Sequence, residues 1–236
     1  ICASVERLYV HRNVYKIFIE KLKEATLKLR QGNPILFDTD VGAMTTFEQL
    51  KLVDEHVQDA KNKGATIMTG GEINQGTGLS GNFYKPTVIS NIDHTFRCVK
   101  EETFGPTLPV MTFTSLNEAI QLANDTEFGL TASVWSKNIK KAREMANSIK
   151  AGTVMINECI YTHGICQTPW GGIKNSGFGK SHAKSGLLEL VESKHIHVNP
   201  LPFIPDFWWY GYNHSLYRNL KTLTHKLSGT LREKIL

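Results

Sequence analysis

The sequence predicts an α/β fold built on a doubly wound, mostly parallel sheet. Runs typical of strands alternate along most of the 236 residues with amphipathic helical runs. Helices of about ten residues or more are the usual connection between parallel strands, whereas antiparallel strands need only a short turn. A hydrophobic content of 41% and a charged content of 21% are ordinary for a globular protein that buries its own core.

The expected elements follow one another from the start of the chain. Strands are expected at residues 4–11, 65–71, 83–92, 108–115, 130–136, 153–157 and 194–199. Helices are expected at residues 13–30, 45–64, 116–127, 139–150 and 184–193. Asn13, and Thr45 or Thr46, are suitable N-caps for the first two helices, because their side-chain oxygens accept from free backbone N–H groups. Gly64 is expected to end the second helix.

The cysteines, histidines and charges exclude several classes of protein. The four cysteines (Cys2, Cys98, Cys159 and Cys166) show no CxxC spacing, which argues against a zinc site or a disulfide framework. They favour a reducing compartment, and we expect the cytoplasm. The histidines show no HxxxH or HExxH spacing, so no metal is expected. The net charge of +5 accompanies no nucleic-acid-binding motif, so no nucleic acid is expected as a partner.

Two adjacent carboxylates, Glu101 and Glu102, precede a Phe-Gly-Pro turn in the stretch KEETFGP. Neighbouring residues of an extended segment point in opposite directions, so the pair cannot act as one acid–base site. We expect one carboxylate to be solvated. The other would point inward and offer two acceptor oxygens to a vicinal diol such as a ribose. The alternative is an acidic surface turn that binds no ligand.

The stretch PWGGIKNSGFGKS is rich in glycine and ends in GKS, as a phosphate-binding P-loop does. A P-loop would need glycine where Lys174 stands, and no GxGxxG occurs anywhere in the chain. One interpretation is a loop at a pocket rim, where glycines let the backbone approach a ligand and Trp170 supplies a flat apolar wall. The other is an ordinary surface loop.

Cys2 lies directly before the first expected strand. A lone cysteine is more often a small buried apolar residue than a nucleophile. With the motifs that follow, however, the chain resembles the C-terminal half of the NAD(P)-dependent aldehyde dehydrogenase superfamily. The similar segments, in the family's order, are CASVERLYV, GATIMTGG, GNFYKPTVISNI, EETFGP, NDTEFGLTASVWS, AGTVMIN and PWGGIKNSGFGK. In the family a Gly-Gln pair precedes the nucleophile, so this chain is expected to be a fragment that begins just after that pair.

The resemblance assigns roles to particular residues. Cys2 matches the catalytic thiol. Glu102 matches the carboxylate that holds the nicotinamide-ribose hydroxyls, and Phe104 matches the ring that packs against the nicotinamide. Gln49 matches a residue near the cofactor more weakly, because the family's lysine three positions further on is absent here. Trp170 matches an aromatic residue of the substrate tunnel.

The resemblance also implies a reaction. A cysteine thiolate attacks an aldehyde, hydride leaves the thiohemiacetal for NAD or NADP, and the thioester is hydrolysed to a carboxylic acid. The backbone N–H of Cys2 would be one oxyanion donor. In the family, the general base, the second oxyanion donor and the Gly-rich cofactor segment lie upstream, so the chain alone is expected to be inactive. The rival interpretations are a non-catalytic binding or structural relative and an acyl-thioester reductase on the same scaffold.

Two parts of the chain are expected to differ in role. Residues 1–199 would form the catalytic part, and by resemblance the strand at 194–199 would pair in a homo-oligomer, a dimer or a tetramer. Residues 200–236 form an aromatic and then basic extension. Its aromatic residues are Phe203, Phe207, Trp208, Trp209, Tyr210 and Tyr212, and its helix-spaced leucines are Leu216, Leu220, Leu223 and Leu227.

Two interpretations of this extension stay open. It docks on the catalytic part or on a neighbouring subunit, as apolar stripes usually do. Or it makes a peripheral contact with an anionic membrane, because a basic amphipathic helix beside Trp and Tyr suits a lipid interface. A membrane contact would bring the enzyme to lipid-derived aldehydes.

Overall fold

The chain divides into two compact units, Ile1–Glu192 and Ser193–Leu236. The structure, a computed structural model, describes residues 1–76, 79–204 and 210–235, and it describes side chains in the last helix as far as residue 228. The boundary lies somewhat earlier than the division expected at residue 199. Each unit is described by itself.

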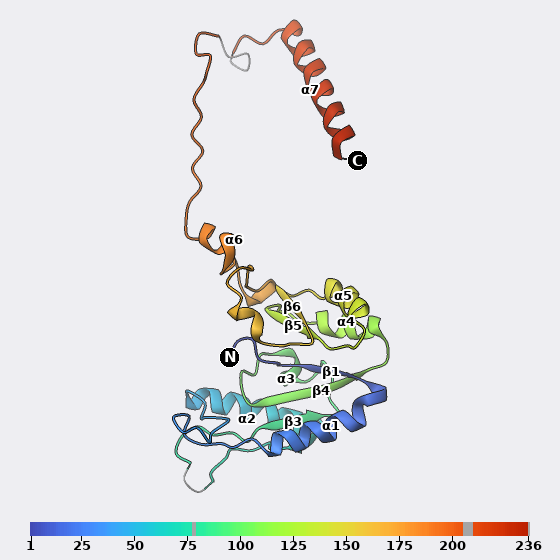
Figure 1. Ribbon diagram of the computed structural model, residues 1–236, viewed down its shortest axis with the longest axis vertical. Coiled ribbons are helices and arrows are strands. Elements are labelled where there is room, and N and C mark those ends of the chain that lie inside the picture. Colours follow the sequence, from blue (N-terminus) through green and yellow to red (C-terminus); the bar gives the residue numbers. More distant parts are fainter. Residues whose placement is uncertain (77–78, 205–209, 236) are drawn as a thin grey trace. The chain divides into compact units, whose positions relative to one another are not determined.

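The larger sheet of the first unit has four strands (Figure 1). In spatial order they are β1 (Leu8–His11), β4 (Thr107–Phe113), β3 (Thr87–Ser90) and β2 (Thr66–Thr69). β1 and β3 both run parallel to β4, and β2 is antiparallel to β3. The sheet is thus mostly parallel, as the alternation of strands and helices predicts.

Helices cover both faces of this sheet, because successive strand residues point to opposite sides. On one face, α1 (Arg12–Leu27) packs Ile19 against Val88 and Val110. On the other face, α2 (Phe47–Asn62) and the short α3 (Arg97–Lys100) enclose Ile89 and Met111. The doubly wound arrangement predicted from the sequence is therefore confirmed.

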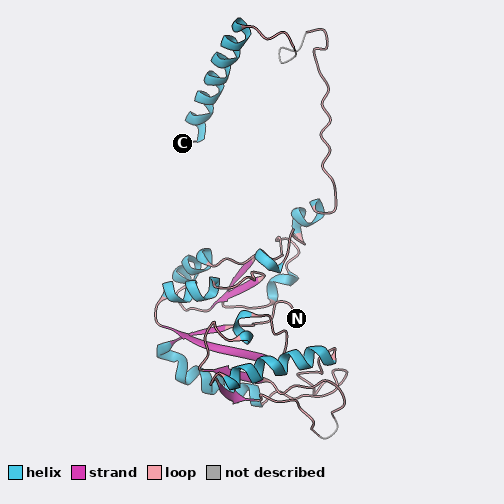
Figure 2. Cartoon of the chain, turned by 180° about the vertical axis from the view of Figure 1, so that it is seen from behind, coloured by secondary structure: helices cyan, strands magenta, loops and turns pink. Residues whose placement is uncertain are grey.

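A second, smaller sheet completes the first unit. It consists of β5 (Thr131–Val134) and β6 (Thr153–Ile156), which run parallel. The helices α4 (Leu116–Asn124) and α5 (Ile139–Ser148) pack beside it and bury Ala119 and Ala142. Figure 2 shows the strands of both sheets in magenta among the cyan helices.

The helix starts agree with the sequence in one case and differ in the other. α2 is capped by Thr46, whose Oγ1 accepts from the Gln49 N–H, as predicted. α1 begins at Arg12, two residues before the first position that an Asn13 cap would allow. Its cap is His11, and Nδ1 of that imidazole accepts from the Asn13 N–H at 3.2 Å. A histidine ring can replace a cap oxygen here because strand β1 runs directly into the helix.

The last predicted strand is not formed in the structure. After the 3-10 turns η1 (Tyr161–Gly164) and η2 (Lys174–Ser176), α6 covers only Ala183–Leu188. Residues 194–199 then have no regular secondary structure, and Ile196 and Val198 are exposed. A strand needs a neighbour to accept its hydrogen bonds, and within the described part of this chain none lies beside these residues. Pairing with a second chain stays a prediction.

The second unit contains α7 (His214–Ile235), at the position where the leucine spacing predicts a helix. Tyr217, Leu223 and Leu227 are exposed on it. The predicted aromatic residues Phe207, Trp208 and Trp209 lie outside the described residues. Of the helices described, none has both the length and the apolar character needed to cross a membrane.

Candidate active site

The segments that carry Cys2 and Glu102 meet because of the sheet topology. Cys2 precedes β1 and Glu102 precedes β4. These two strands are parallel neighbours, with Leu8 opposite Val110. The amino-terminal ends of parallel neighbours lie at the same edge of a sheet. Residues far apart in the sequence are thereby brought together at this edge.

The segment before β1 is fixed soon after Cys2. Ala3 is buried, while the Cys2 side chain is exposed. The Arg7 guanidinium donates to the carbonyl oxygens of Asp125, at 3.1 Å, and Ala123, at 3.5 Å. The cysteine therefore lies at an accessible position on a segment whose other end is anchored to the end of α4.

Glu6 joins this segment to the turn at residues 101–105. Its Oε2 accepts from the Thr103 N–H and its Oε1 from the Phe104 N–H, both at 3.2 Å. Burial raises the pKa of Glu6, and the two N–H groups partly oppose this by stabilising the carboxylate. Phe104 has a φ of 47°, in the left-handed region that a bulky side chain rarely adopts. The turn thus contains backbone strain that the surrounding contacts maintain.

One face of α2 holds the other side of the turn. Gln49, Val53 and His56 are spaced as neighbours on a helix face. The Gln49 Nε2 donates to the carbonyl oxygens of Thr103, at 2.7 Å, and Phe104, at 3.2 Å. A Cβ added to Gly105 would overlap with Val53 Cγ2. Glycine is therefore required there for the turn to approach the helix so closely.

His56 is fully buried beneath the turn. Its Nε2 lies 3.2 Å from Glu101 Oε2, and its Nδ1 lies 3.1 Å from Thr103 Oγ1. Burial lowers the pKa of His56, which favours the neutral imidazole. A carboxylate can only accept, so Nε2 carries the proton, and Nδ1 then accepts from the Thr103 hydroxyl. The network sets the tautomer of His56.

Glu101 and Glu102 are both exposed, so the expectation that one of the two carboxylates points inward is wrong, although the two differ in their partners. Glu101 is paired with Arg97 at 2.9 Å, and these hydrogen bonds lower its pKa. The carboxylate of Glu102 is exposed, without a hydrogen-bond partner among the residues described. The Phe104 side chain is also partly open to solvent, at 43% exposure. The exposed carboxylate of Glu102 and the exposed ring of Phe104 are therefore separated by one residue along the chain.

Trp170 belongs to a separate cluster. Its backbone forms a two-bond bridge with Ser181, and its ring meets the His163 ring edge-on at 4.7 Å. The indole Nε1 is buried without a hydrogen-bond partner among the described residues. Within that part of the chain, neither a hydrogen bond nor a ring contact joins Trp170 to Cys2 or to the turn. Figures 1 and 2 draw the N-terminus on the side of this unit where the loop after β6 runs.

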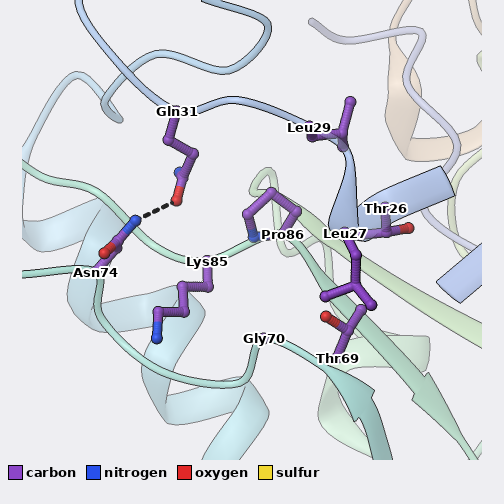
Figure 3. Close-up of a pocket in the computed structure, with 9 residues that line it drawn as sticks. All are labelled: Thr26, Leu27, Leu29, Gln31, Thr69, Gly70, Asn74, Lys85 and Pro86. Carbon is purple, nitrogen blue, oxygen red and sulfur yellow. Dashed lines mark hydrogen bonds between the residues drawn. The ribbon is translucent and has the colours of Figure 1, made fainter. Parts of the chain in front are cut away.

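A pocket of about 240 Å³ lies elsewhere, between the end of α1, the end of β2 and the residues before β3 (Figure 3). Gln31 and Asn74 are hydrogen-bonded at 2.7 Å across it, and Lys85 and Leu27 lie on its walls. Its lining contains no cysteine, histidine or carboxylate, and it includes none of the predicted site residues.

Sequence reasoning missed Glu6 and His56. Glu6 is a charged residue two positions before a strand, a pattern that also fits a solvated position. His56 follows Gln49 by two helical turns, so it shares a face with a residue that was singled out. That spacing is the one signal that could have drawn attention to it. Among the described residues, three or more His, Cys, Asp or Glu side chains nowhere gather as a metal site would need.

The chain is thus an α/β protein in which the segment with the exposed Cys2 thiol is hydrogen-bonded, through Glu6, to the turn that carries Glu102 and Phe104. The Aldehyde dehydrogenase family matches residues 1–196, and the chain belongs to that family. It is similar to the betaine aldehyde dehydrogenase of Bacillus subtilis (strain 168), with 38% identity over 203 residues, covering 86% of this chain and 41% of that protein.

Two further likenesses are informative. The 4,4'-diapolycopene aldehyde oxidase of Methylomonas sp is 38% identical over 223 residues, covering 94% of this chain and 40% of that protein. The structure of the betaine aldehyde dehydrogenase of Staphylococcus aureus in complex with NAD+ has a TM-score of 0.77 and 38% identity, covering 85% of this chain and 41% of that chain. This chain therefore spans about two-fifths of the length of the relatives it matches.

Proposed function

We propose that this chain supplies the nucleophile and the nicotinamide-facing turn of an NAD(P)-dependent aldehyde dehydrogenase. Cys2 is the nucleophile, Glu102, Phe104 and Gln49 face the cofactor, and Trp170 lines the substrate tunnel. The observation that carries the proposal is the double hydrogen bond from Glu6, which ties the Cys2 segment to the turn at Thr103 and Phe104. Several structures of the Staphylococcus aureus relative contain a BME-modified cysteine, so that protein has a reactive thiol.

The residues present fit a nicotinamide cofactor. The open carboxylate of Glu102 offers two acceptors, which suit the two hydroxyls of a ribose. The exposed ring of Phe104 offers an apolar face for a flat heterocycle. Gln49 uses its amide N–H groups to fix the turn, which leaves its carbonyl oxygen as a further acceptor. NAD or NADP, when bound, accepts the hydride.

The chemistry of this chain begins at the Cys2 sulfur. The thiolate adds to the aldehyde carbon, and the carbonyl oxygen becomes an oxyanion that the Cys2 backbone N–H stabilises. Loss of hydride from the thiohemiacetal carbon converts it to a thioester. Attack of water on the thioester releases the carboxylic acid and restores the thiol. By resemblance, the base for that water and the second oxyanion donor belong to a part of the family upstream of the nucleophile.

We propose that this chain corresponds to the C-terminal half of the family's proteins. The 236-residue chain alone would then lack the base and the Gly-rich cofactor segment, and it would be inactive. The comparisons show only that the chain covers about two-fifths of the relatives' length, and the C-terminal position rests on the resemblance of the motifs. Losing a general base costs about 10²–10⁴ in rate, and losing the cofactor-binding segment removes the hydride acceptor. Purified chain should therefore not reduce NAD or NADP with acetaldehyde or a longer aldehyde, and measurable reduction would contradict the assignment.

Cysteine substitution in the full-length parent tests the role of Cys2. Cys2→Ser should abolish turnover while leaving NAD binding nearly unchanged, because a hydroxyl without strong activation is a poor nucleophile. Cofactor binding is measured by fluorescence titration and turnover by absorbance of the reduced cofactor. A non-catalytic relative would show no turnover even before the substitution. An acyl-thioester reductase would instead consume reduced cofactor with a thioester substrate.

The partners and location expected from the sequence are part of the same proposal. The parent is a homo-oligomer in which residues 194–199 pair as a strand, and exposed Ile196 and Val198 are suited to such an interface. It acts in the cytoplasm. Deleting residues 194–199 should lower the mass of the assembly in light scattering, and fractionation of cells tests the location. An unchanged assembly would contradict the pairing.

The extension at residues 200–236 supports a further partner, an anionic lipid surface. Tyr217, Leu223 and Leu227 are exposed on α7, and residues 211–228 contain no acidic residue to repel a negative surface. A match over 94% of the chain necessarily includes part of this extension, and the protein matched is named 4,4'-diapolycopene aldehyde oxidase. We infer a peripheral membrane contact that gives access to lipid-derived aldehydes.

Vesicle co-sedimentation tests the membrane contact. The parent should sediment with phosphatidylserine vesicles at low salt and less at high salt. Reversing the charge of Arg218 and Lys221 should reduce binding, whereas the same reversal of the exposed Lys140 and Lys141 on α5 should not. If removal of residues 200–236 has no effect on binding, the extension docks on protein instead.

A further inference from the structure

We propose that Glu6 is a positioning residue that holds the Cys2 thiol and the cofactor-facing turn in a fixed relation. This inference rests on the proposed function. Glu6 does not touch the reacting atoms. It acts through the backbone of Thr103 and Phe104, the two residues that follow the ribose-facing Glu102.

The geometry of the turn requires a carboxylate. Two successive N–H groups point at one side chain, and each meets a different carboxylate oxygen at 3.2 Å. Two successive N–H groups that converge on one carboxylate form an anion-binding arrangement of the backbone. A glutamine of the same shape has a single acceptor oxygen and would direct its own N–H₂ toward one of the two donors. Glutamate is therefore not replaceable by its amide at this position.

Burying the Glu6 carboxylate costs free energy, and hydrogen bonds from the Thr103 and Phe104 N–H groups offset part of that cost. Burial disfavours its charge, and the neighbouring negative charge of Glu102 adds to that effect, so its pKa is raised. The two backbone N–H groups offset part of the cost. Other charged groups of the site lie apart from this carboxylate: Glu101 is paired with Arg97 and His56, and Arg7 reaches the end of α4.

Glu6 is close enough to Cys2 to control it. The four Cα–Cα steps from Cys2 to Glu6 span at most about 14 Å when the chain is fully extended. Arg7 anchors the next position to the end of α4, so the segment is fixed from both sides at its junction with β1. A shift of the turn is thereby transmitted to the thiol segment. Reacting groups that are misplaced by about 1 Å can lose 10²-fold in rate.

Hydrogen exchange on the complete 236-residue chain tests the contact. Glu6→Gln should accelerate exchange of the Thr103 and Phe104 amides by about tenfold or more, because at least one N–H loses its acceptor. Glu118→Gln is the matched control, since Glu118 also accepts a backbone N–H, that of Thr114 at 2.8 Å, at the start of α4. In the control the glutamine carbonyl oxygen can still accept from the Thr114 N–H, so exchange at Thr103, Phe104 and Thr114 should stay close to that of the wild type. Unchanged exchange at Thr103 and Phe104 in Glu6→Gln would overturn the proposal.

Kinetics of the full-length parent test the positioning role. Glu6→Gln should raise the KM for the cofactor and slow single-turnover hydride transfer by about 10–10². Glu6→Asp keeps both oxygens on a shorter side chain. Its KM and its rate of hydride transfer should lie between those of the wild type and those of Glu6→Gln. A purely structural role would lower Tm but leave KM and hydride transfer unchanged below it, and that result overturns the proposal. If Cys2→Ser retains turnover, the proposed function fails instead, so the two failures are distinguishable.

Discussion

The turn at residues 101–105 and the loop that carries Trp170 are held in different ways. The turn is held by side chains from two other elements: Glu6 before β1, and Gln49 and His56 on α2. The Trp170 loop is held by backbone bonds between Trp170 and Ser181 and by bonds to the segment before β5, such as that from the Ile173 N–H to the Gly129 carbonyl oxygen. Its buried indole N–H has no partner among the described residues. Side chains from other segments therefore fix the turn at residues 101–105, whereas the indole N–H of Trp170 is left unsatisfied within the described chain.

The largest effect on stability should come from a substitution that inserts a side-chain atom between the turn and α2. Gly105→Ala forces a methyl group into Val53, and overpacking of this kind costs about 1–3 kcal/mol. We expect thermal unfolding at a Tm lower by several degrees. Gly164→Ala is the matched control in the other loop, because its added Cβ meets nothing within 4 Å. Equal Tm values for the two variants would show that the turn is not held against α2.

A second substitution tests the hydrogen bonds from Gln49. Gln49→Glu keeps the shape but sets carboxylate oxygens against the carbonyl oxygens of Thr103 and Phe104. Two lost hydrogen bonds should lower the free energy of unfolding by about 2 kcal/mol in urea titration. Gln121→Glu, at an exposed position of α4, controls for the added charge and should change it by less than about 0.5 kcal/mol. A loss common to both variants would be a charge effect.

The sequence predicts the fold more completely than the site. Alternating strand and helix patterns are local, so they identified β1, β4 and α2, whereas Cys2 and Glu102 were assigned by the resemblance of the motifs to a known family. The pairing of β1 with β4 is non-local, and it alone brings Glu6 to Thr103. Open parallel sheets usually bind ligands at their carboxyl ends, whereas here the two segments meet at the amino ends. The strand at 194–199 could not be judged from its own residues, because a strand exists only with a partner.

The pH dependence of stability tests the state of His56. Burial lowers its pKa in the folded chain, while the unfolded chain takes up the proton near pH 6.5. Below pH 6.5 the unfolded state therefore binds more protons, and stability should fall as the pH falls, by up to about 1.4 kcal/mol per pH unit. Urea titrations of His56→Gln should show a shallower decline, and the exposed His214→Gln should behave as wild type. An unchanged slope in His56→Gln would contradict the assignment.

The smallest effect is expected in the Trp170 loop. Trp170→Phe removes a buried N–H that has no partner in the described chain and keeps an aromatic ring against His163. Deleting an unsatisfied donor relieves a cost that offsets the lost packing. The free energy of unfolding should therefore change by less than about 1 kcal/mol. A loss above about 2 kcal/mol would mean that the indole N–H is bonded after all.

We propose that the turn at residues 101–105 sets the cofactor against the Cys2 thiol. Single-turnover hydride transfer in the full-length parent, followed by absorbance of the reduced cofactor, tests it most directly. Glu102→Gln should slow this step by about 10–10², because the nicotinamide ring loses its fixed position. Cys2→Ser should show no hydride transfer, and its absorbance trace defines the background of the measurement. Hydride transfer in Glu102→Gln at the wild-type rate would contradict the account.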